Sequence, residues 1–330
     1  MMRLTKVELR RLFSRRLTAF ALLGALLITG LALFGAFQEA QPLSGEEQAL
    51  QKAAFEQAQK DYAVNGKQMV EDCRKQQAEV QQQDAKADFG CNQMEPTLEN
   101  MGGKPVATFK VMSRNILLGE AYLLASVCFL IGAGFVAAEF SSGSMANWLT
   151  FEPRRMRVYA SKLAAAGLGL VPVTAALLSL LIAGVWLITR QLGSTAGTTA
   201  EVWGDIAEMG GRAVALAVAA AVGGAAVAVL VRHTAAVLGI AIGYLVVVEL
   251  VLGQWLQGAR PWLLQLNIQA WLEHDARYSI PVCATDSRGS YACEQVEKVL
   301  SFAQSSVYLG LLMVFGLALA ALVFRRRDVS

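Results

Sequence analysis

The sequence predicts an all-α membrane protein with six transmembrane helices and with both termini in the cytoplasm. Of its 330 residues, 55% are hydrophobic and only 17% are charged, and a soluble domain of this size could not bury so much apolar surface. Several apolar runs approach the roughly 20 residues that a helix needs to cross a bilayer. The net charge is only +3 and the arginines lie beside the apolar runs, so no nucleic acid partner is expected.

The first element, residues 1–16, alternates apolar residues with cations. This pattern favours a helix in the cytoplasmic membrane interface, although a plain positively charged anchor would have the same composition. Thr5 and Glu8 have the spacing of a capping box. The apolar run that follows is longer than the roughly 7–15 residues of a signal peptide core and lacks a clean cleavage site, so we expect a retained helix.

Six apolar runs are predicted to span the membrane. Basic residues are concentrated before the first run, between the second and the third, at Arg232 after the fourth, and in the tail 325–330. With six spans these regions all fall on one side, which the positive-inside rule assigns to the cytoplasm of a cell membrane. The predicted spans are residues 17–38, 116–138, 163–190, 211–231, 234–253 and 302–324.

The long segment 39–115 is predicted to be a helical hairpin outside the cytoplasm. Ser44 and Glu47 have capping-box spacing, and Asn65 with Gly66 marks a turn between two helical stretches. No arrangement of acids and bases suited to catalysis appears in this segment. We expect a lid or a docking surface here, and the sequence favours neither over the other.

The segment 254–301 lies on the same side and precedes the last span. Its tryptophans and leucines are typical of an interfacial belt. They predict two short re-entrant helices that dip into the outer leaflet, hinged between Gly258 and Pro261, followed by a loop.

The cysteines support this sidedness. Cys73 and Cys91 fall in the first outside segment, Cys283 and Cys293 in the second, and Cys128 lies within a span. Pairs outside and none in the cytoplasmic loops predict two disulfides in an oxidising compartment. Free thiols are the alternative. A metal site is less favoured, because neither pair has the spacing of a zinc motif and the two histidines fall on opposite sides.

The predicted spans contain few charges and many small residues. Glu249, near the outer end of the fifth span, fits either a structural role or a place on a translocation path. Glu120 is expected at the interface. Glycine and alanine gather in "AVGGAAVAV" (221–229) and in "GIAIG" (239–243), where we expect close helix packing within one chain rather than a dimer seam.

The cytoplasmic stretch 139–162 is too elaborate for a plain connector. Small residues permit a cap, and "MANWLTF" then predicts a short amphipathic helix that a proline ends and arginines follow. Glu139 can pair with a cation such as Lys162 or cap this helix. A short helix with an aromatic side chain at a membrane surface is typical of a docking element for a partner protein.

This stretch resembles the loop after the second span of ABC-2-type transporter permeases. The pattern is Glu139–x3–Gly143–x9–Pro153–x–Arg155–x6–Lys162. The basic first helix, the six spans and the re-entrant pair are similar as well, whereas the segment 39–115 departs from members with short loops. The resemblance implies a coupling helix that seats in a separate ATPase, and it implies coupling roles for Glu139, Gly143, Trp148, Leu149, Pro153, Arg154, Arg155 and Lys162.

The function implied is that of a permease subunit in an ATP-driven exporter. Two permease protomers, as a homodimer or a heterodimer, would work with two ATPase subunits in contact with membrane lipids. The substrate would be hydrophobic or amphipathic (a drug, a peptide or a lipid), with sodium export as a lesser option. The chain has no GxxxxGK[ST] phosphate loop, so ATP and Mg²⁺ would be bound by the partner and this chain would be neither an enzyme nor a holder of a cofactor or metal. The alternative is a membrane sensor or scaffold that docks a cytoplasmic partner.

Overall fold

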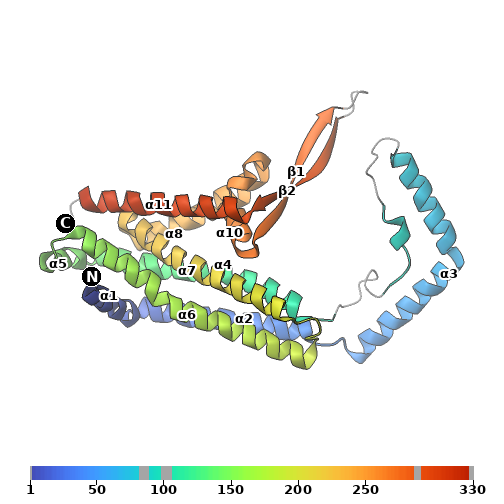
Figure 1. The fold of residues 1–330 in the computed structure, drawn as a ribbon, viewed down its shortest axis with the longest axis horizontal. Coiled ribbons are helices and arrows are strands. Elements are labelled where there is room, and N and C mark those ends of the chain that lie inside the picture. Colours follow the sequence, from blue (N-terminus) through green and yellow to red (C-terminus); the bar gives the residue numbers. More distant parts are fainter. Residues whose placement is uncertain (1, 82–88, 98–105, 286–290, 327–330) are drawn as a thin grey trace.

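A computed structural model describes residues 2–81, 89–97, 106–285 and 291–326. Most of the described chain is helical, and the long helices form an elongated bundle (Figure 1). Six helical segments are long and apolar enough to cross a membrane, and they overlap the six predicted spans. They are α2 (Arg16–Ala40), α4 (Phe109–Ser141), α6 (Arg155–Leu192), α7 (Ala200–Val231), α8 with η2 (Thr234–Leu252) and α11 (Phe302–Arg326). The prediction of a multi-pass membrane protein is confirmed at this level.

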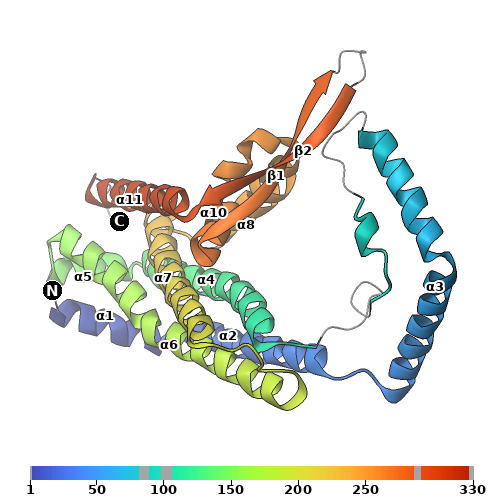
Figure 2. The ribbon, with the colours of Figure 1, turned by 45° about the vertical axis from the view of Figure 1, so that its right-hand side comes forward.

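The two ends of the bundle differ. At one end lie α1 (Met2–Ser14), α5 (Ser144–Phe151) and the last turn of α11, so the first and last helices meet at the same end (Figure 1). Toward the other end lie α3 (Gly45–Gln81) and a two-stranded sheet, both of which extend away from the long helices (Figure 2). Which end faces the cytoplasm stays a prediction.

The predicted turn at Asn65 and Gly66 is wrong, because α3 continues without interruption through both residues. The residues around them are mostly strong helix formers, and their summed propensity outweighs the roughly 1 kcal/mol that one glycine costs. Gly66 also makes room for the Tyr62 ring, since a Cβ at Gly66 would lie 2.8 Å from that ring. At the start of α3 the predicted capping box is confirmed: the Ser44 backbone N–H donates to Glu47 Oε2 at 2.9 Å.

The predicted disulfide between Cys73 and Cys91 is present. Their Cα atoms are 5.7 Å apart, and the bond closes a loop with a sequence separation of 18. Cys91 begins the short helix η1 (Cys91–Gln93). The disulfide therefore links η1 to α3. Cys128 is free and buried, within α4 as predicted.

The prediction of an all-α fold is wrong in the last segment before α11. Residues expected to form a loop form an antiparallel hairpin of β1 (Asp275–Thr285) and β2 (Tyr291–Ser301). In β1 apolar residues recur at every second position, and the register pairs Ala276 with Leu300 and Ile280 with Val296. This period-two pattern is the signal of a strand.

The second cysteine pair fits this register. Cys283 stands opposite Cys293 across the hairpin, and Cys293 is disulfide-bonded. The side chain of Cys283 lies outside the described part of the chain, so its pairing with Cys293 stays a prediction. Residues 286–290 and 327–330 are also outside it.

The predicted re-entrant pair corresponds to three short helices. They are α9 (Gly253–Trp255), η3 (Gln257–Trp262) and α10 (Leu264–Glu273). The chain bends at Leu256 and Leu263, not between Gly258 and Pro261 as expected, because η3 passes through the proline. Their depth in a membrane stays a prediction.

The centre of the bundle depends on glycines in α4 and α7. A Cβ on Gly132 would overlap the carbonyl oxygen of Ala221, and a Cβ on Gly224 would overlap that of Phe129. The two helices therefore meet backbone to backbone, as predicted for the small residues of 221–229. The prediction fails for 239–243: beyond the helix's own turns, no described atom lies within 4 Å of a Cβ built on Gly239 or Gly243.

Candidate functional site

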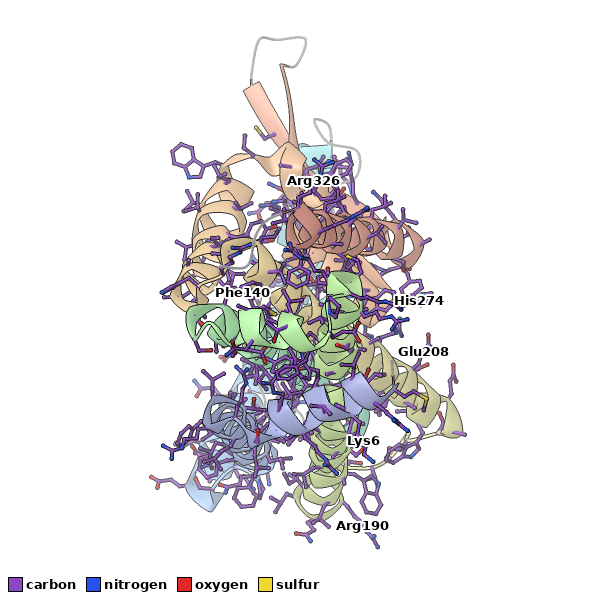
Figure 3. The ribbon with its side chains drawn as sticks, turned by 90° about the vertical axis from the view of Figure 1, so that its left-hand side faces the viewer. Lys6, Phe140, Arg190, Glu208, His274 and Arg326 are labelled. Carbon is purple, nitrogen blue, oxygen red and sulfur yellow. A yellow bond between two sulfur atoms is a disulfide. The ribbon has the colours of Figure 1, made fainter. Side chains whose placement is uncertain are left out.

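The short helix α5 forms where it was predicted. Gly143 precedes it with φ of 69°, a left-handed conformation that glycine adopts without steric cost and that separates α5 from α4. Glu152 and Pro153 end it, because Pro153 cannot supply a backbone N–H donor. Figure 3 views the end of the bundle at which α5 and α1 lie, with Lys6 marking α1, Phe140 the end of α4 and Arg326 the end of α11.

The two faces of α5 have different surroundings. Met145 is buried, and Trp148 and Leu149 pack against the core formed by α4, α6, α7 and α11. Phe151 is 83% exposed. Trp148 and Leu149, which were predicted to be anchors for a partner, therefore hold α5 to its own bundle. Phe151 is the aromatic side chain that projects outward.

Trp148 connects α5 to α1. Its Nε1 donates a hydrogen bond to Glu8 Oε1 at 2.6 Å, and the Arg11 guanidinium carbon lies 4.9 Å from the centroid of its ring. These contacts combine a charge-assisted hydrogen bond with a cation–π interaction. A displacement of α5 must therefore move α1 or break both contacts.

Beneath α5 lies a group of five charged side chains, called here the charge cluster. Glu139 Oε1 accepts from Arg15 Nη2 at 2.8 Å and lies 3.7 Å from Arg11 Nη1. Lys162 Nζ donates to Glu139 Oε2 and also lies 3.0 Å from Glu8 Oε1. The charge cluster thereby joins α1, the α1–α2 junction, α4 and α6. The predicted pairing of Glu139 with Lys162 is confirmed.

The two acids and Lys162 of the charge cluster are buried, whereas the Arg11 and Arg15 side chains are 38% and 25% exposed, and the charge cluster carries one net positive charge. Glu8 is 0% exposed, Glu139 1% and Lys162 2%. Charges in such a place are tolerated only when they are paired. The Phe135 ring adds a further contact, with the Arg15 guanidinium carbon at 5.1 Å and Lys162 Nζ at 5.4 Å from its centroid.

Glu8 is one of three members of the charge cluster, with Arg11 and Arg15, that were not predicted to be site residues. The predicted capping box of Thr5 and Glu8 is wrong, because α1 begins at Met2 and both residues lie inside the helix. Leu4, Glu8 and Leu12 recur at intervals of four and so share one face of α1. A lone acid on the apolar face of a basic helix was the available signal, since it requires a buried cation.

The remaining residues of the predicted coupling set lie around α5. Pro153 and Arg154 are exposed, and Arg154 precedes the first residue of α6, Arg155. Both arginines follow Phe151 closely in the chain. Their position suits contact with acidic groups of a partner or with lipid phosphates.

Glu249 lies in η2 (Tyr244–Leu252), a stretch of π-helix. Its Oε1 accepts hydrogen bonds from the Tyr244 hydroxyl at 2.9 Å, from Leu264 N–H at 2.7 Å and from Gln265 N–H at 3.2 Å. The last two N–H groups belong to the first turn of α10 and have no acceptor within their own helix. Glu249 therefore caps α10 from another segment. This geometry favours the structural role of the two roles predicted.

Glu249→Gln is expected to leave the protein folded with a loss below about 1 kcal/mol, because the amide oxygen still accepts from α10. Glu249→Leu is expected to cost about 2 kcal/mol or more, since two backbone N–H groups and a tyrosine hydroxyl lose their acceptor. Thermal unfolding of the purified variants in detergent checks both values. Equal melting temperatures for the leucine variant and the wild type would contradict the capping role.

A polar cavity of about 370 Å³ lies between α4, α7 and α10. Arg114 pairs with Glu273 at 3.2 Å, and Arg212 pairs with Glu208 at 3.4 Å. Figure 3 labels Glu208 and His274 of this cavity. The first pair joins α4 to α10, whereas the second lies within α7, so one of these ion pairs connects two helices.

Among the described residues, no group of three or more His, Cys, Asp or Glu side chains could hold a metal ion. Neither a model of a known protein family, nor a curated protein, nor a solved structure matches this chain.

Proposed function

We propose that this chain is the permease subunit of an ATP-driven exporter of the ABC-2 type, and that a cytoplasmic ATPase docks on α5. Two permease protomers and two ATPases form the working unit, and the ATPase binds ATP and Mg²⁺. The substrate is a hydrophobic or amphipathic molecule that leaves the cytoplasm or the inner leaflet. The observation that carries the proposal is the connection from α5 through Trp148 to Glu8 and the charge cluster.

This connection supports a transmission role. Glu8 Oε1 is shared between Trp148 of α5 and Lys162 of α6, and Lys162 is shared between Glu8 and Glu139 of α4. A push on α5 is therefore passed to α1, α4 and α6 together. Because breaking one member would leave a buried charge without its partner, the elements move as one body.

Phe151 supplies the docking anchor in this proposal. It is the large apolar side chain of α5 that faces away from the bundle, and buried aromatic anchors commonly contribute 2 kcal/mol or more at interfaces. Arg154 and Arg155 beside it orient the partner through its acidic groups or contact lipid phosphates. Removing them should weaken docking less than removing Phe151, because pairs at an interface rim are solvated.

The test requires a cognate ATPase, co-purified with the permease and reconstituted in proteoliposomes. Phe151→Ser is expected to weaken capture more than tenfold and to abolish stimulation of ATP hydrolysis. Val64→Ser is the matched control, because Val64 is 81% exposed in α3 and Phe151 is 83% exposed. Wild-type capture and stimulation by Phe151→Ser would overturn the docking assignment.

Docking and transmission can be separated with Trp148→Phe. This variant keeps an aromatic ring on the inner face of α5 but loses the N–H that donates to Glu8. The ATPase should therefore still bind, while ATP hydrolysis no longer drives export. Trp148→Ala with Leu149→Ala should detach α5 and weaken both steps. Binding of a different cytoplasmic protein at Phe151, without any ATPase, would favour the sensor or scaffold instead.

A further inference from the structure

A buried carboxylate in α4 has too few partners. Glu120, expected at the membrane interface, is 2% exposed, and its Oε1 lies 2.5 Å from the hydroxyl of Thr29 in α2. That hydroxyl also lies 3.1 Å from the carbonyl oxygen of Ala25, and its single proton serves one acceptor at a time. Glu120 Oε2 has no hydrogen-bond partner in the part of the chain that the structure describes.

Glu120 lines a groove between α2 and α4 that has a volume of about 350 Å³. Its walls are mostly apolar, with Ala36 from α2 and Leu123 from α4. Space for a ligand remains because Gly119 lines the groove without a side chain and no described atom outside its own helical turns lies within 4 Å of a Cβ built there. A second carboxylate, Glu39, also lines the groove and is exposed near the end of α2.

These groups define the chemistry that the groove recognises. A carboxylate at membrane depth is costly unless a cation or a hydrogen-bond donor compensates it, and no ion pair to Glu120 occurs among the described residues. A metal cation such as Ca²⁺ would need six or more oxygen ligands, and the groove offers two carboxylates. An organic cation needs only one charged acceptor and an apolar wall.

We propose that the groove between α2 and α4 binds an apolar organic cation whose nitrogen carries hydrogen. The ammonium group donates to Glu120 Oε2, and the apolar body lies against Ala36 and Leu123. Glu39 raises the local concentration of cations near the groove. As a substrate site this inference rests on the proposed export function, but binding itself requires neither ATP nor the ATPase, so the two can fail separately.

The experiment measures binding of rhodamine 6G, an apolar cation with N–H groups, to the full chain in phosphatidylcholine nanodiscs by fluorescence polarisation. Saturable binding is expected, with octylamine as a competitor and octanol, which has the same chain length but no charge, as a non-competitor. Glu120→Gln is expected to raise the Kd at least tenfold. Glu46→Gln, an identical change at an exposed position of α3, is expected to leave the Kd unchanged.

A second variant tests the groove without touching the carboxylate. Gly119→Leu fills the groove and is expected to abolish binding, while the open space around Gly119 lets the helix keep its fold. Elution as a single species in gel filtration verifies folding of each variant. No saturable binding by the wild type, equal competition by octanol, or wild-type affinity in Gly119→Leu would each overturn the proposal.

Discussion

Replacing Glu139 with glutamine is expected to lower the free energy of unfolding by about 3–5 kcal/mol. The change keeps the size of the side chain but leaves three cations of the charge cluster with Glu8 as their only carboxylate. Lys162 loses its closest counter-charge in a place that water does not reach, and the partly exposed Arg15 loses its closest counter-charge as well. Unfolding by sodium dodecyl sulfate in mixed micelles measures the loss.

Two further variants make this expectation specific. Glu56→Gln, the same change at an exposed position of α3, is expected to cost no more than about 0.5 kcal/mol. Lys162→Met combined with Glu139→Gln removes one charge of each sign, so the double variant should be more stable than the sum of the single losses predicts. Unchanged unfolding of Glu139→Gln would show that the charge cluster does not stabilise the bundle.

Gly224→Ala is expected to lower the free energy of unfolding by about 3 kcal/mol or more, at the upper end of overpacking costs. The added methyl group would overlap the backbone carbonyl of Phe129 in α4. A carbonyl in a helix backbone cannot rotate away as a flexible side chain does, so α4 and α7 must separate. This separation would also disturb the contacts of Gly132 with Ala221 at the same crossing.

The neighbouring glycine provides the control. A Cβ on Gly223 would meet only the sulfur of Met313, at 3.6 Å, which is ordinary van der Waals contact. Gly223→Ala is therefore expected to be neutral or to stabilise α7 slightly, because alanine favours a helix by about 1 kcal/mol over glycine. Equal melting temperatures for the two single variants in detergent would contradict the close approach of α4 and α7 at Gly224.

The six spans and the outline of the α5 segment were predictable because they depend on local properties of the chain. The length of an apolar run determines whether a helix can cross a membrane, and Gly143 and Pro153 separate α5 from its neighbours through their own backbone preferences. The capping box of Ser44 and Glu47 needs only three residues of spacing. Glu139 at the end of a span was expected to pair with a cation such as Lys162 or to cap the short helix, and the structure shows the pair.

Other features depend on which helix faces meet, and only the tertiary structure decided these. Gly223 and Gly224 are neighbouring glycines in an apolar run of α7, yet only Gly224 faces the backbone of α4. Trp148 looks like a docking anchor on an isolated helix, but α1 and the charge cluster turn it inward and leave Phe151 exposed. Glu8 and Glu120 acquired their environments in the same way. Hydropathy and charge can be taken from the order of residues in the chain. Burial depends on how each helix is rotated about its axis against its neighbours, which the order of residues does not specify.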